Sequence, residues 1–336
     1  MRFALSTNWN NARLDDGAAI ADEAIALGFD ALELGFRTMP EQIAGFKSRL
    51  DQIPVDSVHA YCPVPIGAPS GHPELHQLAH HDEDERALAR MLLKKTLACA
   101  ADLGAKVVVT HAGYADLNGL FAKLDSSVLR ELVINPDGVP DVKQPVYAKR
   151  LAKAHARRTK RGRKLLEVFR RELDLVIPEL EKLGITLALE NLPSIEGFPN
   201  AEEAEALMKD LAGAPVRLWF DTGHARVREC RQWDAPAAEV ATRLATWVRG
   251  MHLNDVKDIH DDHFAPGRGN VDFASLKPLA QREGMLHVVE PHSEVTAADL
   301  RAGLALLRRI WEDGKSQLQN PLLILTQSPL SSQSHP

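Results

Sequence analysis

The 336-residue sequence has few cysteines, no long apolar run and no excess of basic residues. The three cysteines, Cys62, Cys99 and Cys230, form no CxxC pair, which argues against a disulfide framework and is typical of a reducing compartment. No apolar stretch reaches the roughly 20 residues that a transmembrane helix needs. The first ten residues, MRFALSTNWN, are a strand-like run and not a signal peptide. These absences predict a cytoplasmic protein that does not bind a membrane.

The net charge, the lack of repeats and the length narrow the possible classes of protein. The formal net charge of −6 argues against a dedicated nucleic-acid binder, which usually carries a basic surface, without excluding one. The sequence also lacks an internal repeat of about 20–50 residues, which argues against a solenoid or a propeller. Length alone allows one large domain or two ordinary ones. A single barrel usually needs roughly 250 residues and tolerates insertions.

The sequence contains a regular alternation of short apolar runs with segments whose apolar residues have helical spacing. Glycines such as Gly28, Gly104 and Gly184 close several of these segments, as helix C-caps do. Strands are expected at 2–6, 31–34, 55–59, 106–110, 185–189, 216–220, 248–252 and 286–290. Helices are expected at 15–27, 40–50, 82–103, 149–183, 200–211, 235–247, 271–283 and 296–311.

This alternation predicts an α/β protein, a single (β/α)8 TIM barrel formed by residues 1–314. An irregular segment rich in Gly, Pro and Asn predicts an inserted loop around residues 112–147, followed by a long fourth helix. The Ser/Gln/Pro-rich residues 315–336 are expected to form a flexible C-terminal tail. The histidine-rich loop 61–81 is expected to shape a pocket or an oligomer contact, which is compatible with a homo-oligomer.

A basic run precedes the apolar face of the long fourth helix. It consists of Lys149, Arg150, Lys153, Arg157, Arg158, Lys160, Arg161, Arg163 and Lys164. The apolar face begins only at Leu165, so we expect the first turns to be free of the core and to project from the catalytic face. Two interpretations stay open, namely contact with a substrate phosphate or a DNA backbone and a solvated helix extension.

Four of the later strands end in a residue of a type that binds metals. Glu190 ends one strand in LALENLP, Asp221 in LWFDTGH, His252 in VRGMHLND and Glu290 in HVVEPH. The strands of such a barrel present their carboxyl ends at one mouth, so we expect the four side chains to converge there. Two glutamates, an aspartate and an imidazole suit Mn²⁺, Mg²⁺, Co²⁺ or Zn²⁺. An isolated loop-facing residue is the alternative for each, but four consecutive strands favour a metal site.

Five more residues of these types follow strands. His59 and His111 end two earlier strands, His224 follows Asp221 by three residues, and Asp261 and His263 come after the seventh strand. They are candidates for a second or third metal ion or for substrate binding. The histidines at the strand ends could instead be core imidazoles or contacts to a substrate, and Asp261 and His263 could simply order the loop that carries them.

The segments LGAKVVVTHAG, ALEN, FDTGHA, HLND and DDHFAPGRGNVDF carry a resemblance over residues 1 to about 312. With them, the chain resembles the xylose isomerase-like TIM barrel superfamily, which contains sugar and sugar-phosphate isomerases and epimerases and the metal-dependent apurinic-site endonucleases. The resemblance implies that Glu190 and Glu290 are catalytic, transferring a proton through a metal-bound enediolate. It implies metal binding by Glu190, Asp221, His252 and Glu290, and substrate binding by His224 and Arg268.

The endonuclease branch of the resemblance implies a different ligand set. There, residues matching His59 and His111 share a second zinc with a glutamate like Glu190, and His224, Asp261 and His263 match the ligands of a third. The acidic charge and an aromatic content of 5% argue against an enzyme that opens DNA. The sequence also departs from ketohexose epimerases, since Asp258 stands where those enzymes have arginine.

We therefore expect a divalent-metal-dependent sugar or sugar-phosphate isomerase or epimerase, with a small-molecule sugar as its partner and no nucleic acid. Mn²⁺ is the favoured ion, and Zn²⁺, Co²⁺ and Mg²⁺ are alternatives. The alternative activity is a multinuclear-zinc phosphodiesterase of the apurinic-site endonuclease type.

Overall fold

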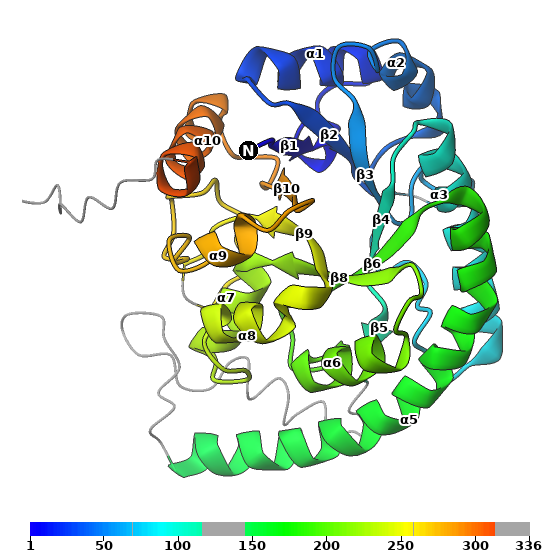
Figure 1. Ribbon diagram of the computed structural model, residues 1–336, viewed down its shortest axis with the longest axis vertical. Helices are drawn as coiled ribbons and strands as arrows, with labels where there is room; N and C mark the ends of the chain where they lie inside the picture. The colour runs from blue at the N-terminus through cyan, green and yellow to red at the C-terminus, as the bar shows by residue number, and fades with distance from the viewer. Residues whose placement is uncertain (69, 116–144, 258, 313–336) are drawn as a thin grey trace, which may run out of the picture.

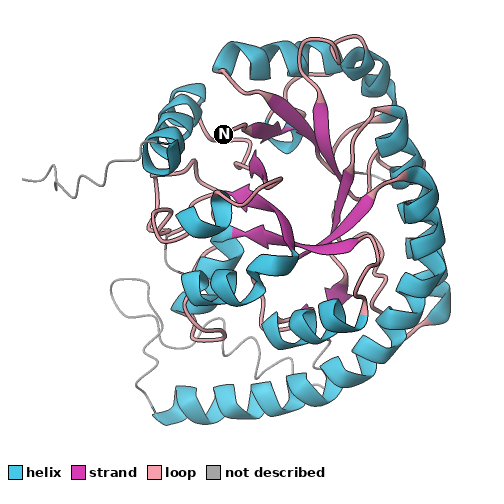
Figure 2. Cartoon of the chain, viewed as in Figure 1, coloured by secondary structure: helices cyan, strands magenta, loops and turns pink. Residues whose placement is uncertain are grey.

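The computed structural model describes residues 1–68, 70–115, 145–257 and 259–312, and these residues form a closed parallel barrel. Eight strands follow one another around it in the order β1, β10, β9, β8, β6, β4, β3, β2. Helices surround the strands on the outside (Figures 1 and 2), so the predicted (β/α)8 barrel is confirmed. The barrel strands are β1 Ala4–Ser6, β2 Ala31–Leu34, β3 Val55–His59, β4 Val107–Thr110, β6 Thr186–Glu190, β8 Val216–Asp221, β9 Val248–Leu253 and β10 Leu286–Val289.

The helices follow the predicted alternation. The first of them begins after Asp16, whose carboxylate accepts a hydrogen bond from the Ala18 N–H, and ends at Gly28 with φ of +87°, a conformation that favours glycine. The α-helices are α1 Gly17–Leu27, α2 Ile43–Lys47, α3 Glu83–Asp102, α5 Pro145–Leu183, α6 Ala201–Asp210, α7 Thr222–Cys230, α8 Ala237–Leu244, α9 Lys277–Ala280 and α10 Ala297–Glu312. Short 3-10 helices are η1 Thr7–Trp9, η2 Pro40–Gln42 and η3 Ala245–Trp247.

Two helices differ from the prediction. α7 was not predicted, because its sequence TGHARVREC contains only a few small apolar residues. It begins because Asp221 caps it, with the carboxylate accepting a hydrogen bond from the His224 N–H at 2.7 Å. The helix predicted at 271–283 is reduced to the four residues of α9. The Val271 N–H donates to the Asp255 carboxylate instead of opening a helix.

A small antiparallel pair, β5 Gly113–Tyr114 and β7 Gly197–Phe198, lies outside the barrel. Strands of two residues give no periodic signal, so the sequence could not indicate them. Most of the predicted insertion, residues 116–144, and the whole predicted tail, residues 315–336, lie outside the described residues. Asp258 lies outside them as well.

One large side chain and several small ones fill the barrel interior. Trp219, 1% exposed, packs there against Ala4, Ala31, Val107, Val109, Ala188 and Val288, in a cluster separate from the main core. Gly250 on β9 leaves the space for the indole, because a Cβ there would lie 2.1 Å from Trp219 Cζ3. The interior is thus a packed core, as in other barrels of this kind, and the open space for chemistry lies at the mouth.

The first turns of α5 are not free of the core, so that part of the prediction is wrong. Tyr147 and Ala154 are buried against Ile195 and Trp233 in a small hydrophobic cluster. Figure 1 shows this helix curving around the outside of the molecule, from beneath α6 towards α3. The apolar residues between the basic ones form a second face, which the basic composition of the run had concealed.

Arg158, a member of the basic run, is only 1% exposed. Its guanidinium donates to both carboxylate oxygens of Glu203 on α6, at 2.6 and 2.7 Å, and to the Gly197 carbonyl at 2.8 Å. Other members of the run are exposed, namely Lys149, Lys153, Lys160, Arg163 and Lys164. The run therefore supplies one buried cross-link between helices, and contact of its exposed face with a phosphate stays a prediction.

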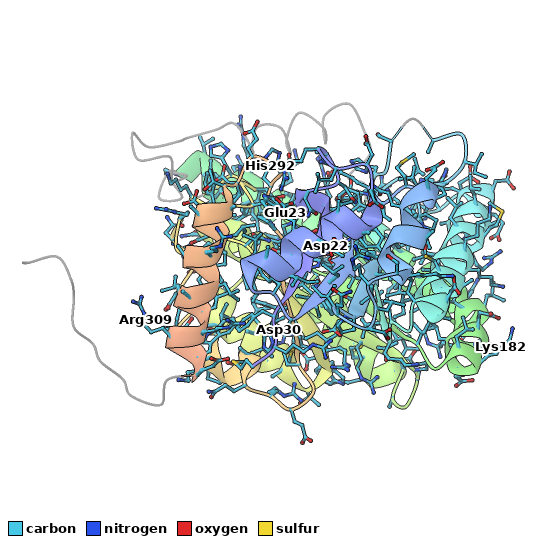
Figure 3. All side chains as sticks on the ribbon, turned by 90° about the horizontal axis from the view of Figure 1, so that it is seen from above. Asp22, Glu23, Asp30, Lys182, His292 and Arg309 are labelled. Carbon is cyan, nitrogen blue, oxygen red and sulfur yellow. The ribbon has the colours of Figure 1, made fainter. Side chains whose placement is uncertain are left out.

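Charged side chains mark the outer faces of the surrounding helices. Figure 3 shows Lys182 on α5 and Arg309 on α10 at the outside of the molecule. Within the described ranges, no helix combines the length and the apolar character that crossing a membrane requires.

Replacing Arg158 with methionine should lower the free energy of unfolding by about 3–5 kcal/mol, because Glu203 would remain buried without its partner. The matched change Arg163→Met, on the exposed side of the same helix, should change it by less than about 0.5 kcal/mol. Urea unfolding followed by circular dichroism measures both. Equal losses in the two variants would contradict the structural role of Arg158, and the double variant Arg158→Met/Glu203→Met should regain part of the loss.

Candidate metal centre at the barrel mouth

Four of the predicted ligands converge at the carboxyl ends of four neighbouring strands. Glu190 and Asp221 end β6 and β8, His252 lies near the end of β9, and Glu290 directly follows β10. His252 Nδ1 lies 3.0 Å from Glu190 Oε1, 3.2 Å from Glu290 Oε2 and 3.7 Å from Asp221 Oδ2. Ligands at about 2.0–2.2 Å from one ion are roughly 3–4.4 Å apart, and all three distances fall in that range. We name these four residues cluster A.

Glu190 also belongs to a second group, cluster B, which it forms with His59 and His111. Its Oε2 lies 3.1 Å from His59 Nε2 and 3.3 Å from His111 Nε2, while its Oε1 faces cluster A. His59 is the last residue of β3 and His111 follows β4 directly. One carboxylate therefore joins the two clusters, with one oxygen directed to each.

Cluster C consists of His224, Asp261 and His263. His224 Nε2 lies 3.5 Å from Asp261 Oδ2, and His263 Nε2 lies 3.3 Å from Asp261 Oδ1. His224 comes from the first turn of α7, whereas the other two come from the loop after β9. His263 has φ of +47°, a strained conformation for a residue with a side chain. Such strain persists only where neighbouring contacts hold it, and His292 N–H donates to the His263 carbonyl at 2.8 Å.

The buried carboxylate of Asp255 holds the loop that carries cluster C. It accepts hydrogen bonds from the backbone N–H groups of Val256, Gly267, Gly269 and Val271, at 2.8 to 3.0 Å. The glycine at 269 is required for this fit, because a Cβ there would lie 2.3 Å from the Val256 carbonyl oxygen. Asp255 therefore fixes both ends of a long irregular segment and places its metal-type ligands over the mouth.

Each of the five histidines has one ring nitrogen directed at a cluster. In four of them the other nitrogen contacts a hydrogen-bond acceptor, whereas His111 Nδ1 faces Glu74 at 3.4 Å without forming a hydrogen bond. A neutral imidazole that donates through one nitrogen presents a lone pair at the other, which is the state a metal requires. The outer contacts are His59 Nδ1 with Ala60 O at 2.8 Å, His111 Nδ1 with Glu74 Oε1 at 3.4 Å, His224 Nδ1 with Asn191 O at 2.7 Å, His252 Nε2 with Glu33 Oε1 at 3.0 Å and His263 Nδ1 with Glu290 O at 3.0 Å.

The clusters bury several charges close together. Burial alone lowers the pKa of His252, but the charges of Glu290 and Glu190 outweigh it and raise that pKa well above its ordinary value. The same opposition raises the pKa of His111 to about 9 and that of His263 to about 10. Burial would raise the pKa of Glu190, but the neighbouring imidazoles hold it well below its usual range. The carboxylates thus create a site that attracts positive charge, whether protons or cations.

Sequence reasoning missed the residues that support the ligands. Asn191 bridges two strand ends, accepting from the Asp221 N–H at 2.8 Å and donating to the Asp221 carbonyl at 3.1 Å. Asn254 donates to Asp221 Oδ2 at 2.7 Å. Asn191 and Asn254, with Asp255, stood in the recognised segments ALEN and HLND without an assigned role. Glu33 is the single acid in the otherwise apolar strand ALEL, and this pattern could have indicated a buried carboxylate with a polar partner.

Not every predicted residue joins the clusters. Arg268 is exposed and forms an ion pair with Asp299 in the first turn of α10, so its assignment to the substrate stays a prediction. In the histidine-rich loop, Glu74 reaches cluster B, where it faces His111 and accepts from the Tyr114 hydroxyl. His76 pairs with Glu85 at 3.0 Å, and a role in an oligomer contact stays untested.

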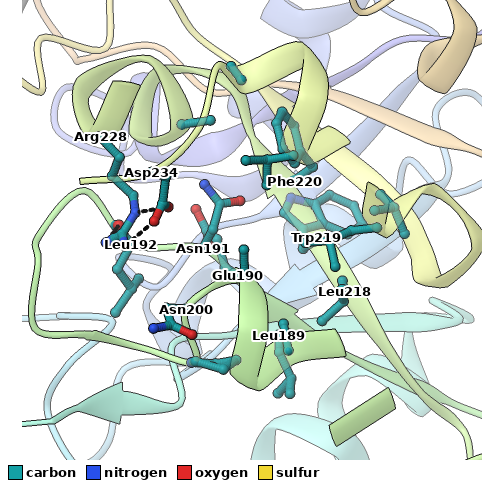
Figure 4. Close-up of a pocket in the computed structure, with 18 of the residues that line it drawn as sticks. Leu189, Glu190, Asn191, Leu192, Asn200, Leu218, Trp219, Phe220, Arg228 and Asp234 are labelled. Atoms are coloured by element: carbon teal, nitrogen blue, oxygen red, sulfur yellow. Dashed lines mark hydrogen bonds and ion pairs between the residues drawn. The ribbon is translucent and has the colours of Figure 1, made fainter. Parts of the chain in front are cut away.

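A mostly apolar cavity of about 40 Å³ lies behind the barrel wall (Figure 4). Leu189, Leu218 and Phe220 line it from β6 and β8, and the Arg228–Asp234 ion pair stands at its side. Apolar side chains of α6 and α8 line it as well, and Glu190, Asn191 and Asn200 border it on the side of the strand ends. Its size and apolar lining mark it as a packing defect between strands and helices and not as the site of chemistry.

The chain resembles solved structures over nearly its whole length. A D-tagatose 3-epimerase-like protein has 19% identity and a TM-score of 0.64, covering 93% of this chain and 97% of its own. The 3-keto-D-glucoside 4-epimerase of E. coli has 16% identity and a TM-score of 0.62, covering 92% and 99%. The TTHB071 protein of Thermus thermophilus, from a crystal soaked with ZnCl₂, has 24% identity and a TM-score of 0.55, covering 94% and 99%.

At these identities the likeness establishes the fold alone. A comparison with curated proteins found no matching sequence. A family profile described as xylose isomerase-like TIM barrel matches residues 21–310, which is most of the chain and includes every residue of clusters A, B and C. The closed barrel and the ligands at its strand ends agree with that match, and the chain belongs to the xylose isomerase-like TIM barrel family.

Proposed function

We propose that this protein is a divalent-metal-dependent isomerase or epimerase of a sugar or sugar phosphate, with the metal in cluster A. The observation that carries the proposal is the convergence of three carboxylates and one imidazole from four neighbouring strands, with ligand atoms within 4.8 Å of one another. The sugar epimerases among the similar structures agree with this reaction class.

The donor set of cluster A fits a divalent cation. Three carboxylates and a neutral imidazole carry a formal charge of −3, all of it buried, and a dication offsets most of that charge. Mixed oxygen and nitrogen ligands suit Mn²⁺ first, with Zn²⁺, Co²⁺ and Mg²⁺ as alternatives. When bound, such an ion would act as a Lewis acid on a substrate carbonyl and its neighbouring hydroxyl, which acidifies the C–H bond between them.

Glu190 and Glu290 are the proposed acid and base. They come from β6 and β10, so they flank Asp221 and His252 of the two strands between them in the barrel order. One of the two, as a carboxylate, removes the proton from the substrate carbon and becomes a carboxylic acid. The other, starting as a carboxylic acid, delivers its proton from the opposite side, which inverts that carbon. Asn8 donates to Glu290 Oε1 at 3.2 Å and leaves Oε2 facing the cluster.

The contacts of His224, His59 and His111 indicate what each residue could do in this reaction. His224 lies 3.4 Å from Glu190 Oε1 through Nδ1, and its Nε2 faces the mouth beside Asp261. This supports its proposed role as a hydrogen-bonding contact to a substrate hydroxyl. His59 and His111 direct their nitrogens at the second oxygen of Glu190, and in this proposal they orient that carboxylate.

A second candidate function is a multinuclear-zinc phosphodiesterase. The observation that favours it is the presence of clusters B and C beside cluster A, since three groups of metal-type ligands exceed what one ion needs. A multinuclear centre supplies a hydroxide and stabilises the attacking and leaving oxygens of a phosphodiester. The net charge of −6 and the aromatic content of 5% argue against binding and opening DNA, so this function remains second.

Metal analysis separates the two functions. If the isomerase proposal is right, protein purified without chelator and equilibrated with Mn²⁺ should retain about one ion per chain, and Asp221→Ala should lose it. Inductively coupled plasma mass spectrometry after gel filtration measures the ratio. Three zinc ions per chain together with nicking of an abasic-site oligonucleotide would reject the first function in favour of the second.

Glu290→Gln should abolish proton exchange at the substrate carbon, because an amide cannot take the proton. A screen of ketoses, sugar phosphates and oxidised sugars in D₂O with Mn²⁺, followed by NMR, identifies the substrate whose C–H exchanges. The matched control is Glu294→Gln, four residues further along the same loop and exposed. Exchange that survives in Glu290→Gln at the wild-type rate would remove Glu290 from catalysis.

A further inference from the structure

A buried carboxylate beneath the mouth has no part in the proposed reaction. Glu33 on β2 is 0% exposed and points into the barrel, two residues after Ala31 of the interior cluster. Its Oε1 lies 3.0 Å from His252 Nε2, and its Oε2 accepts a hydrogen bond from the Ser57 hydroxyl at 2.8 Å. Neither oxygen reaches the mouth directly, because His252 lies between Glu33 and the other residues of cluster A.

The contact of Glu33 with His252 is built into the strand pairing. Glu33 and Ser57 are partners in the register of β2 and β3, so the hydroxyl stands beside the carboxylate and fixes its orientation. The imidazole plane is fixed independently. His59 stacks on His252 with ring centroids 5.8 Å apart and an interplanar angle of 10°, and Trp219 meets it edge-on at 5.3 Å.

We propose that Glu33 is the positioning residue of the metal ligand His252, which it holds with the proton on Nε2 so that Nδ1 presents its lone pair to cluster A. This inference rests on the proposed metal centre. Glu33 touches neither the substrate nor the ion. It acts through the hydrogen bond from Nε2–H to its carboxylate, which also makes the imidazole a better electron donor to a cation.

The chemistry of an amide at position 33 makes the inference testable. In Glu33→Gln the carbonyl oxygen would accept from Ser57, which leaves the amide NH₂ facing His252 Nε2. That nitrogen would then have to accept a hydrogen bond, and the ring proton would move to Nδ1, where it blocks the cation. Removing the Ser57 hydroxyl as well frees the amide to turn its carbonyl oxygen towards His252, which restores the original tautomer.

The experiment measures Mn²⁺ affinity by isothermal titration calorimetry in the wild type, Glu33→Gln and Glu33→Gln/Ser57→Ala. We expect Glu33→Gln to bind Mn²⁺ about 10–100-fold more weakly, the usual cost of losing an outer partner of a metal-bound histidine. The double variant should regain most of that loss, which a merely structural role of Glu33 would not produce. Unchanged affinity in Glu33→Gln, or a double variant weaker than the single one, overturns the proposal.

A measurement on the unaltered protein covers the case in which the variants fail to fold. In wild type labelled with ¹⁵N-histidine and loaded with Zn²⁺, the slowly exchanging ring proton of His252 should be on Nε2. A proton on Nδ1 overturns the role of Glu33 while leaving the metal centre intact. If the wild type binds neither Mn²⁺ nor Zn²⁺, the proposed metal centre itself fails, and this inference fails with it.

Discussion

The structure depends on how it stabilises negative charge buried at one end of an apolar barrel. Glu33, Glu190, Asp221 and Glu290 are each at most 6% exposed, and an unpaired buried carboxylate is strongly destabilising. Each has at least one imidazole, amide, hydroxyl or backbone N–H within hydrogen-bonding distance. Glu190 is the centre of this arrangement, because its two oxygens face different clusters.

The strands fix the positions of these carboxylates and of the imidazoles beside them. Side chains alternate along a strand, so the residue two positions before an inward ligand also points inward. Glu33 follows Ala31, and Glu190 follows Ala188, with both alanines in the barrel interior. Register then sets neighbours across strands, as in the pairing of Asp221 with His252. Clusters A and B are therefore built mainly on rigid elements, which favours a defined coordination geometry.

Cluster C is built differently, from a helix start and an irregular loop. His224 is placed by the cap that Asp221 supplies to α7, and the loop carrying Asp261 and His263 is held by the four N–H groups that donate to Asp255. Asp221 thus contributes to two clusters. It is a member of cluster A, and as the N-cap of α7 it positions His224 of cluster C. The position of cluster C therefore depends on the contacts of one helix start and one loop, and not on strand register.

The sequence by itself determined the alternation of strands and helices, the barrel and the residues at the strand ends, because period, length and strand-end polarity are local signals. Every strand bound agrees to within two residues, and the nine candidate ligands that the sequence indicated lie together in clusters A, B and C. Only the tertiary structure decided which carboxylate oxygen faces which cluster, that Arg158 is buried, and that Glu33 contacts His252. These features depend on register and packing between segments far apart in the chain, and Glu33 and His252 are 219 positions apart.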